Sequence, residues 1–198
     1  KNTWIIFTAD HGEMLGDHHM SQKNLFFEGS AHVPLLIMPP QGRSLPQNIS
    51  VEAPTDLVDL YPTILAMAGL SSPVSVSGRN LLEPVPMDRI FFGNSLNRNF
   101  CVMEEKLKLV YSAVGDHVLL FDLNTDPMEQ HNLAEDPAWQ ERKAKLWKLL
   151  LEHTAQYTPE ALDENGQFLT YEAPHFPGDV PGRWFGFHYH DYSVDTFH

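Results

Sequence analysis

The sequence predicts an α/β protein: a domain with a parallel-dominated sheet, followed by a small antiparallel sheet with one covering helix. The first part is indicated by apolar runs at residues 4–9 and 35–38, which have the composition of strands buried on both faces. The second part is indicated by four short strand-like segments after Met87 and by a helical pattern after Asp136.

The first part, residues 1–86, also contains a predicted helix. Residues 55–70 place apolar side chains at helical spacing, and Gly69 is a natural end for such a helix. Pro62 either begins this helix or kinks it. Residues 71–86 are rich in Ser and Pro, so they are expected to form a linker over the surface.

The second part, residues 87–160, reads as an antiparallel meander with a helix after it. Asp136 can cap that helix and Pro137 suits its first turn, so the helix is expected to run over residues 138–157. Residues 161–198 hold many Pro, Gly, His and aromatic residues, which favours an ordered tail. The four strand candidates are RIFFGNS, FCVMEE, KLKLVYS and HVLLFDL.

Composition excludes several classes of partner. The chain has 198 residues, of which 42% are hydrophobic and 20% charged, as in a globular protein. Its formal net charge of -13 argues against nucleic acid or an anionic membrane surface as partner. No run approaches the roughly 18 apolar residues of a membrane span, and the single cysteine, Cys101, permits no internal disulfide. The chain opens on Lys1 and enters a strand almost at once, so we expect a piece of a longer protein whose compartment the sequence leaves open.

Asp10 and His11 directly follow the first predicted strand. Ligands of open α/β sheets bind beyond the carboxyl ends of the strands, which is where these two residues lie. A carboxylate and an imidazole are both metal-ligand types. The alternative is an N-cap formed by Asp10 beside a chance histidine.

A second polar cluster, Gly16-Asp17-His18-His19, precedes Lys23. An imidazole can give a proton to a leaving oxygen, and an ammonium can hold an anionic oxygen as a point charge. The alternative is an ordinary solvated loop. The functional interpretation rests on the crowding of all these groups into residues 10–23, directly after one predicted strand. We also expect Glu28 to steady this loop.

At this point the sequence resembles a known family. The block TADHGEMLGDHHMSQKNLFFEGSAHVPLLI is similar to a stretch of the sulfatases, within the alkaline phosphatase superfamily. Residues 56–70 resemble the family's V-D-L-x-P-T-L-L helix, and residues 106–137 resemble its K-L-[IV]-Y … L-[FY]-D-L-x-x-D-P-x-E-x-x-N-L pattern. The resemblance spans about residues 4–150 and implies the C-terminal part of an alkaline-phosphatase-like domain.

The resemblance implies roles for these residues. Asp10 and His11 would be ligands of a divalent cation, most often calcium in this family, although the imidazole leans toward manganese or zinc. Lys23 would contact a sulfate oxygen, and His18 or His19 would contact the substrate or its leaving oxygen. His19 stands where many members carry glycine. The substrate implied is a sulfated small molecule or glycan.

One part of the family's machinery has no counterpart in the sequence. Sulfatases use a formylglycine nucleophile made from Cys or Ser in a C/S-x-P-x-R motif, and neither Cys101 nor any serine stands in such a motif. We therefore expect the chain by itself to be inactive. It is also expected to associate with itself through exposed sheet edges.

Two other functions stay open. The chain can belong to a relative that acts on phosphate or phosphonate esters, which the nucleophile would distinguish. It can also be a non-catalytic binding module that kept the fold, which predicts no affinity for metal at Asp10.

Overall fold

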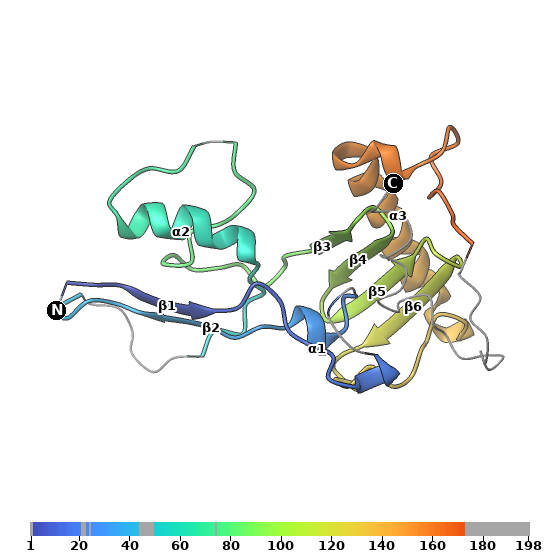
Figure 1. Ribbon diagram of the computed structural model, residues 1–198, viewed down its shortest axis with the longest axis horizontal. Coiled ribbons are helices and arrows are strands. Elements are labelled where there is room, and N and C mark those ends of the chain that lie inside the picture. The colour runs from blue at the N-terminus through green and yellow to red at the C-terminus, as the bar shows by residue number, and fades with distance from the viewer. Residues whose placement is uncertain (1, 21–22, 24, 44–49, 74, 173–198) are drawn as a thin grey trace, which may run out of the picture. The chain divides into compact units, whose positions relative to one another are not determined.

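The computed structural model describes residues 2–20, 23, 25–43, 50–73 and 75–172 (Figure 1). Contacts divide the chain into two compact units: unit 1 is Lys1–Asp10 with Val33–Arg89, and unit 2 is His11–His32 with Ile90–His198. The segment 11–32, which carries most of the candidate site residues, thus folds with the C-terminal unit. The boundaries at residues 86 and 160 stay a prediction.

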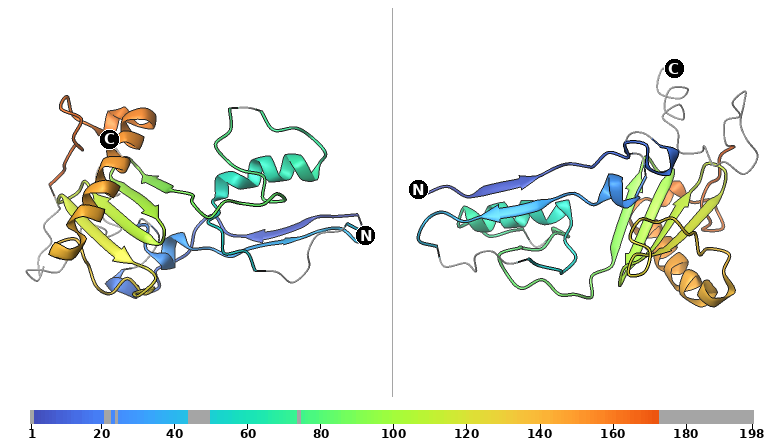
Figure 2. Two further views of the ribbon diagram at one scale, coloured as in Figure 1. Left: turned by 180° about the vertical axis from the view of Figure 1, so that it is seen from behind. Right: turned by 90° about the horizontal axis from the view of Figure 1, so that it is seen from below.

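Unit 1 contains a two-stranded antiparallel sheet of β1 (Ile5–Thr8) and β2 (Leu35–Met38). Ile5 pairs with Met38 and Thr8 with Leu35. The parallel pairing and two-sided burial predicted for these runs are wrong for the described residues, since alternate side chains of both strands are exposed. An apolar strand is buried on both faces only if both faces are covered, and here the helix α2 (Leu60–Met67) lies on one side of the ribbon (Figures 1 and 2).

The helical segment of unit 1 confirms the prediction for residues 55–70. It begins as the short 3-10 helix η2 (Leu57–Asp59), continues as α2, and ends before Gly69, whose φ is 74°. Pro62 falls in the first turn of α2, where its missing N–H is tolerated. Asp56 and Asp59 cap each other's backbone amides at the start of this segment.

A buried carboxylate holds the following turn against this helix. Asp59 is fully buried and accepts hydrogen bonds from the backbone N–H of Arg79 at 2.7 Å and from the guanidinium of Arg89 at 2.5 Å. Gly78 has no room for a side chain, because a Cβ there would lie 2.0 Å from the carbonyl oxygen of Val58. These contacts hold the turn at residues 78–79 against the helical segment.

Unit 2 contains the antiparallel meander that the sequence predicts. Its strand order is β3-β4-β5-β6, with each strand hydrogen-bonded to the next along the chain. The strands are β3 (Phe91–Ser95), β4 (Asn99–Glu104), β5 (Leu107–Ser112) and β6 (His117–Asp122).

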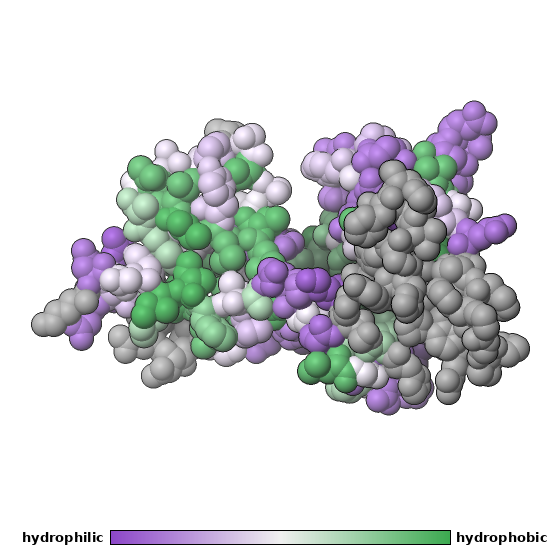
Figure 3. All heavy atoms as spheres, viewed as in Figure 1, coloured by the Kyte–Doolittle hydropathy of each residue, from purple (hydrophilic) through white to green (hydrophobic). Residues whose placement is uncertain are grey.

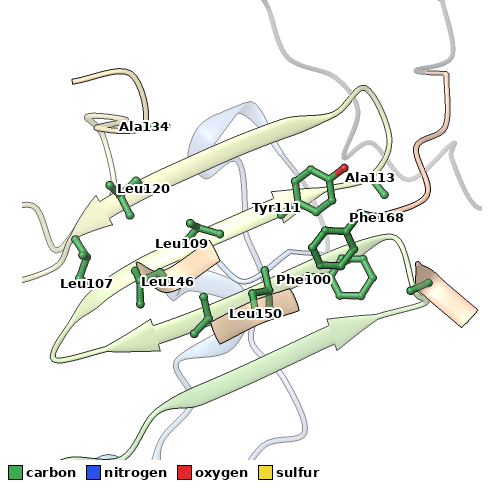
Figure 4. Close-up of a cluster of buried hydrophobic side chains, with 12 residues drawn as sticks. Phe100, Leu107, Leu109, Tyr111, Ala113, Leu120, Ala134, Leu146, Leu150 and Phe168 are labelled. Carbon is green, nitrogen blue, oxygen red and sulfur yellow. The ribbon is translucent and has the colours of Figure 1, made fainter. Parts of the chain in front are cut away.

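One face of this sheet is covered by the long helix α3 (Gln140–Tyr157), as Figures 1 and 2 show. The helix follows the 3-10 turn η3 (Pro137–Trp139), and Asp136 caps this turn by accepting from the N–H of Ala138, as predicted. Figure 4 shows the core between them. It contains Phe100, Leu107, Leu109, Tyr111, Leu120, Leu146, Leu150 and Phe168.

The opposite face of the sheet is covered by the segment 11–32, which includes the 3-10 turn η1 (Asp17–His19) and the short helix α1 (Glu28–Ala31). Because side chains alternate along a strand, β5 sends Leu109 to α3 and Val110 to this second core. The second core contains Met14, Met20, Leu25, Phe27, Cys101, Val110, Leu119 and Phe121. The candidate site is thus carried on a sheet that is packed on both faces.

The chain after α3 forms η4 (Pro159–Ala161) and a short stretch that reaches Tyr171, whose backbone bridges to Val114. Of the predicted ordered tail, residues 173–198 lie outside the described residues. Within the described part of the chain, no helix is long and apolar enough to span a bilayer.

Candidate active site

His11 and Lys23 meet in unit 2, although they are twelve positions apart in the sequence. The ammonium Nζ of Lys23 contacts Nε2 of His11, and Nδ1 of the same ring lies 2.8 Å from the carbonyl oxygen of Gly12. A carbonyl oxygen only accepts and an ammonium only donates. The proton of the neutral imidazole therefore lies on Nδ1, and the lone pair on Nε2 faces the lysine.

Glycine at position 12 is required by the close approach of two backbone segments. The N–H of Gly12 donates to the carbonyl of Ser30 at 2.8 Å, and the N–H of Glu13 donates to Gly29 at 2.9 Å. A Cβ on Gly12 would lie 2.1 Å from the carbonyl oxygen of Gly29. This pairing fixes the backbone next to His11 against α1.

Asp10 directly precedes His11 in the chain, and the boundary between units 1 and 2 falls between the two residues. The Asp10 side chain is exposed. Among the described residues there is no group of three or more His, Cys, Asp and Glu side chains with the spacing of a metal site. The role of Asp10 and His11 as ligands of a divalent cation stays a prediction.

His18 is exposed and packs on Phe27. Its backbone has a positive φ of 52°, and its ring stacks on that of Phe27 with the centroids 4.1 Å apart and the planes 11° from parallel. Phe27 is itself buried against Phe121 of β6. The core therefore orients this imidazole. The backbone of His19 lies in η1, and its side chain lies outside the described part of the chain.

A buried ion cluster, which the sequence did not reveal, lies behind this segment. Lys108 of β5 is 3% exposed, and its ammonium contacts the carboxylates of Glu28 and Glu129. Burial by itself lowers the pKa of Lys108, but its negative neighbours outweigh burial and raise this pKa above its ordinary value. The expectation that Glu28 steadies the loop acquires a physical basis here, because its carboxylate links α1 to the sheet.

A sequence signal for this cluster does exist. In KLKLVYS the lysines alternate with apolar residues, which reads as one solvated and one buried face. Both faces are covered in the structure, so the face that carries Lys108 is buried and needs a counter-charge.

Cys101 lies in the same core and is not a nucleophile candidate. Burial raises the pKa of its thiol to about 12, so the thiol is neutral and unreactive at physiological pH. Cys101 is thus a buried residue of β4 with a structural role.

The structure of this chain is similar to solved structures of ester hydrolases. The structure superimposes on a proposed sulfatase from Bacteroides thetaiotaomicron VPI-5482 with a TM-score of 0.69, over 91% of this chain and 43% of that one, at 23% identity. It also superimposes on the phosphonate monoester hydrolase of Agrobacterium radiobacter with a TM-score of 0.61, over 83% of this chain and 38% of that one, at 32% identity. The fold is therefore that of the alkaline-phosphatase-like class.

Sequence comparison points to one family within this class. The model of the sulfatase family matches residues 1–70. The chain is 32% identical to the uncharacterised sulfatase YidJ of Escherichia coli (strain K12) over 77% of this chain and 32% of that protein. It is 34% identical to arylsulfatase K of Xenopus laevis over 67% of this chain and 28% of that protein. The chain spans about a third of the length of these relatives, and its relationship to the sulfatases is confirmed.

Proposed function

We propose that this chain provides the cation- and sulfate-binding part of a sulfatase, and that the complete protein hydrolyses sulfate monoesters of a small molecule or glycan. The observation that supports this most directly is the contact between His11 and Lys23 in the segment that resembles the family's motif. It brings a metal-type ligand and a positive charge to one place, as a reaction on a sulfate anion requires.

Asp10 and His11 are the ligands that we propose for a divalent cation, with calcium expected and manganese or zinc as alternatives. The tautomer of His11 fits this role. Because Nδ1 donates its proton to the carbonyl oxygen of Gly12, Nε2 carries the lone pair that would coordinate a cation. A bound cation would polarise the sulfate ester and offset its developing negative charge. The negative net charge of the protein adds to the attraction for such an ion.

Lys23 is proposed to hold a sulfate oxygen. Cleavage of a sulfate monoester leaves negative charge on the departing oxygen and on the sulfuryl group. A fixed ammonium stabilises that charge without any proton transfer. The Nε2 lone pair of His11 can serve either Lys23 or a metal ion but not both, so cation binding would release Lys23 toward the substrate.

His18 and His19 are the proposed proton donors to the leaving oxygen. His18 is held by its stack on Phe27, which leaves both ring nitrogens at the edge of the stack. The formylglycine nucleophile of the family would come from residues outside this chain, because no C/S-x-P-x-R motif occurs in it. We accordingly propose that the isolated chain does not turn over sulfate esters.

The test uses the complete natural protein, loaded with calcium or manganese and assayed with an aryl sulfate. Lys23→Met should lower kcat/KM by about 10²–10³, the usual loss on removing one preorganised donor. Lys148→Met, which removes an exposed lysine of α3, serves as the matched control and should leave the rate unchanged. Wild-type rates in the Lys23→Met variant would refute the role of this residue.

A second candidate function is the hydrolysis of phosphonate or phosphate esters. It is favoured by the similarity to the phosphonate monoester hydrolase described above, which is 32% identical to this chain. The ratio of kcat/KM for an aryl sulfate and an aryl phosphonate ester, measured on one preparation, decides between the two reactions.

A non-catalytic binding module is the remaining alternative. It predicts that calorimetry detects no calcium or manganese binding that depends on Asp10. Titrations of the wild type and of Asp10→Ala test this directly, and cation binding that is lost in Asp10→Ala excludes the module.

A further inference from the structure

We infer that Lys108 is a positioning residue for Lys23 and His11: its buried ammonium, held by Glu28 and Glu129, fixes α1, and α1 fixes both partners of the site. The inference rests on the proposed function for its catalytic consequence. Its structural part stands on contacts within unit 2 alone.

The ammonium of Lys108 has a complete set of partners. An ammonium has three N–H donors. They find the carbonyl oxygen of Phe26 at 2.9 Å, Oε1 of Glu129 at 2.8 Å and Oε1 of Glu28. A lysine that is 3% exposed would be costly without such pairing. Since all three acceptors must stay in place, the cluster constrains the chain on either side of Phe27.

Glu129 joins the cluster to the first turn of α1. Its Oε1 accepts from Lys108, while its Oε2 accepts from the backbone N–H of Glu28 at 2.7 Å. The N-cap residue Phe27 offers no side-chain oxygen, so a carboxylate 101 positions away in the sequence satisfies this amide. Glu129 has a positive φ of 55°, a conformation rarely adopted by non-glycine residues, which indicates that its placement is held by its contacts.

The short helix then passes this constraint to the two site residues. Ser30 donates from its hydroxyl to the backbone carbonyl of Lys23 at 2.9 Å. The carbonyls of Gly29 and Ser30 accept from the two residues after His11. Both ends of the His11–Lys23 contact are therefore attached to a segment whose own position depends on Lys108.

The sheet supplies the rigid base for this chain of contacts. Lys108 lies on the face of β5 that also carries Val110, and it pairs across the strands with Met103 and Phe121. A small displacement of catalytic groups is enough to lower a rate by about 10²-fold. Removal of Lys108 should thus lower kcat although this residue touches neither substrate nor metal.

The experiment compares Lys108→Met with Lys145→Met in the complete natural protein. Lys145 forms an ion pair with Glu104 on the α3 side of the sheet and is the matched control. We expect Lys108→Met to lower kcat for an aryl sulfate by about 10- to 100-fold, with KM changed less than kcat. Amide hydrogen exchange in peptides covering residues 11–32 should accelerate in the same variant, and Lys145→Met should change neither quantity.

Glu129→Gln keeps the size of the side chain and provides the milder test if Lys108→Met fails to fold. It should accelerate exchange at the amide of Glu28 and lower kcat in the same direction, while Lys108→Arg, which keeps the charge, should restore part of the rate. A folded Lys108→Met or Glu129→Gln variant with wild-type kcat and unchanged exchange over residues 11–32 would overturn the inference.

The two readouts separate this inference from the proposed function. A wild-type protein without activity on any sulfate ester would refute the proposed function, and the exchange of residues 11–32 would still decide whether Lys108 positions the segment. Accelerated exchange with unchanged kcat in an active protein would refute the positioning role.

Discussion

The two units of this chain differ in how far they bury their apolar side chains. In unit 1 the apolar residues of the ribbon and helix are largely exposed, and Figure 3 shows apolar side chains at the surface over these elements. The exposed residues include Ile5, Phe7, Leu36, Met38, Val58, Tyr61 and Ile64. The fully buried side chains Asp59 and Thr63 of unit 1 are polar. In unit 2 the sheet is packed on both faces by apolar side chains.

The candidate site residues therefore belong to two units that are stabilised by different interactions. Apolar burial stabilises a fold by about 25 cal/mol per Å², and unit 2 gains it on both faces of its sheet. In unit 1 the helical segment and the turn that follows it are joined by hydrogen bonds of the buried Asp59 and Thr63. The segment with His11, His18 and Lys23 belongs to the well-packed unit, whereas Asp10 belongs to the other.

The largest effect is expected at the buried carboxylate of unit 1. Asp59→Ala should destabilise that unit by about 3–5 kcal/mol, because it leaves the partly buried guanidinium of Arg89 without this carboxylate. Asp56→Ala, which removes the other member of the cap, should cost about 1 kcal/mol. Amide hydrogen exchange resolved by peptide measures both. Equal acceleration in units 1 and 2 would contradict the view that they are held separately.

A pair of leucines in strands tests the comparison of packing. Leu109→Ala removes a fully buried side chain of β5 and should cost about 2–5 kcal/mol. Leu36→Ala removes a side chain of β2 that is 59% exposed and should change stability by no more than about 0.5 kcal/mol. Urea denaturation followed by tryptophan fluorescence gives both values. Similar losses in the two variants would show that the ribbon is buried in solution.

Self-association of the isolated chain provides a third test. Phe7 and Leu36 pair across β1 and β2 and are both exposed, so this face should drive association. The double variant Phe7→Thr and Leu36→Thr should weaken it at least about tenfold, or ~1.4 kcal/mol. Analytical ultracentrifugation over a concentration series measures the change, with Met128→Thr of unit 2 as control. A wild-type chain that stays monomeric would remove this expectation.

The smallest effect is a pH dependence in unit 2. His153 of α3 stacks on Phe92 with ring centroids 3.9 Å apart, and burial lowers its pKa below the ordinary value. The unfolded chain therefore binds a proton at a higher pH than the folded chain does. The contribution of His153 to stability is complete above the unfolded pKa and is lost as the pH falls through the folded pKa.

His153→Phe should remove this component, so the stability of the variant should vary less than that of the wild type between neutral and mildly acidic pH. Denaturation midpoints measured across that range check the prediction. An identical pH profile in both proteins would refute it.

Much of the fold followed from local patterns. The strands of unit 2 are short apolar segments, Asp136 and Pro137 mark the start of the turn η3 that leads into α3, and α2 ends before Gly69, so each of these elements carries its own signals. No local signal shows that β1 pairs with β2 in an antiparallel direction, because an apolar run looks the same in a parallel and an antiparallel sheet. For the site, the sequence motif predicted His11 and Lys23 as functional residues. The contact between their side chains depends on α1, which the motif does not describe.

By itself, the sequence determined the residue types of the site, the order of the elements and the relationship to the sulfatases, because motif spacing and hydrophobic periodicity are local properties of the chain. Only the tertiary structure decided that Lys108 is buried, that Glu129 caps α1 and that residues 11–32 cover the second face of the sheet. Those facts arise from contacts between positions that are far apart in the chain. The alternation in KLKLVYS marks two faces of β5, but it does not specify what covers each face.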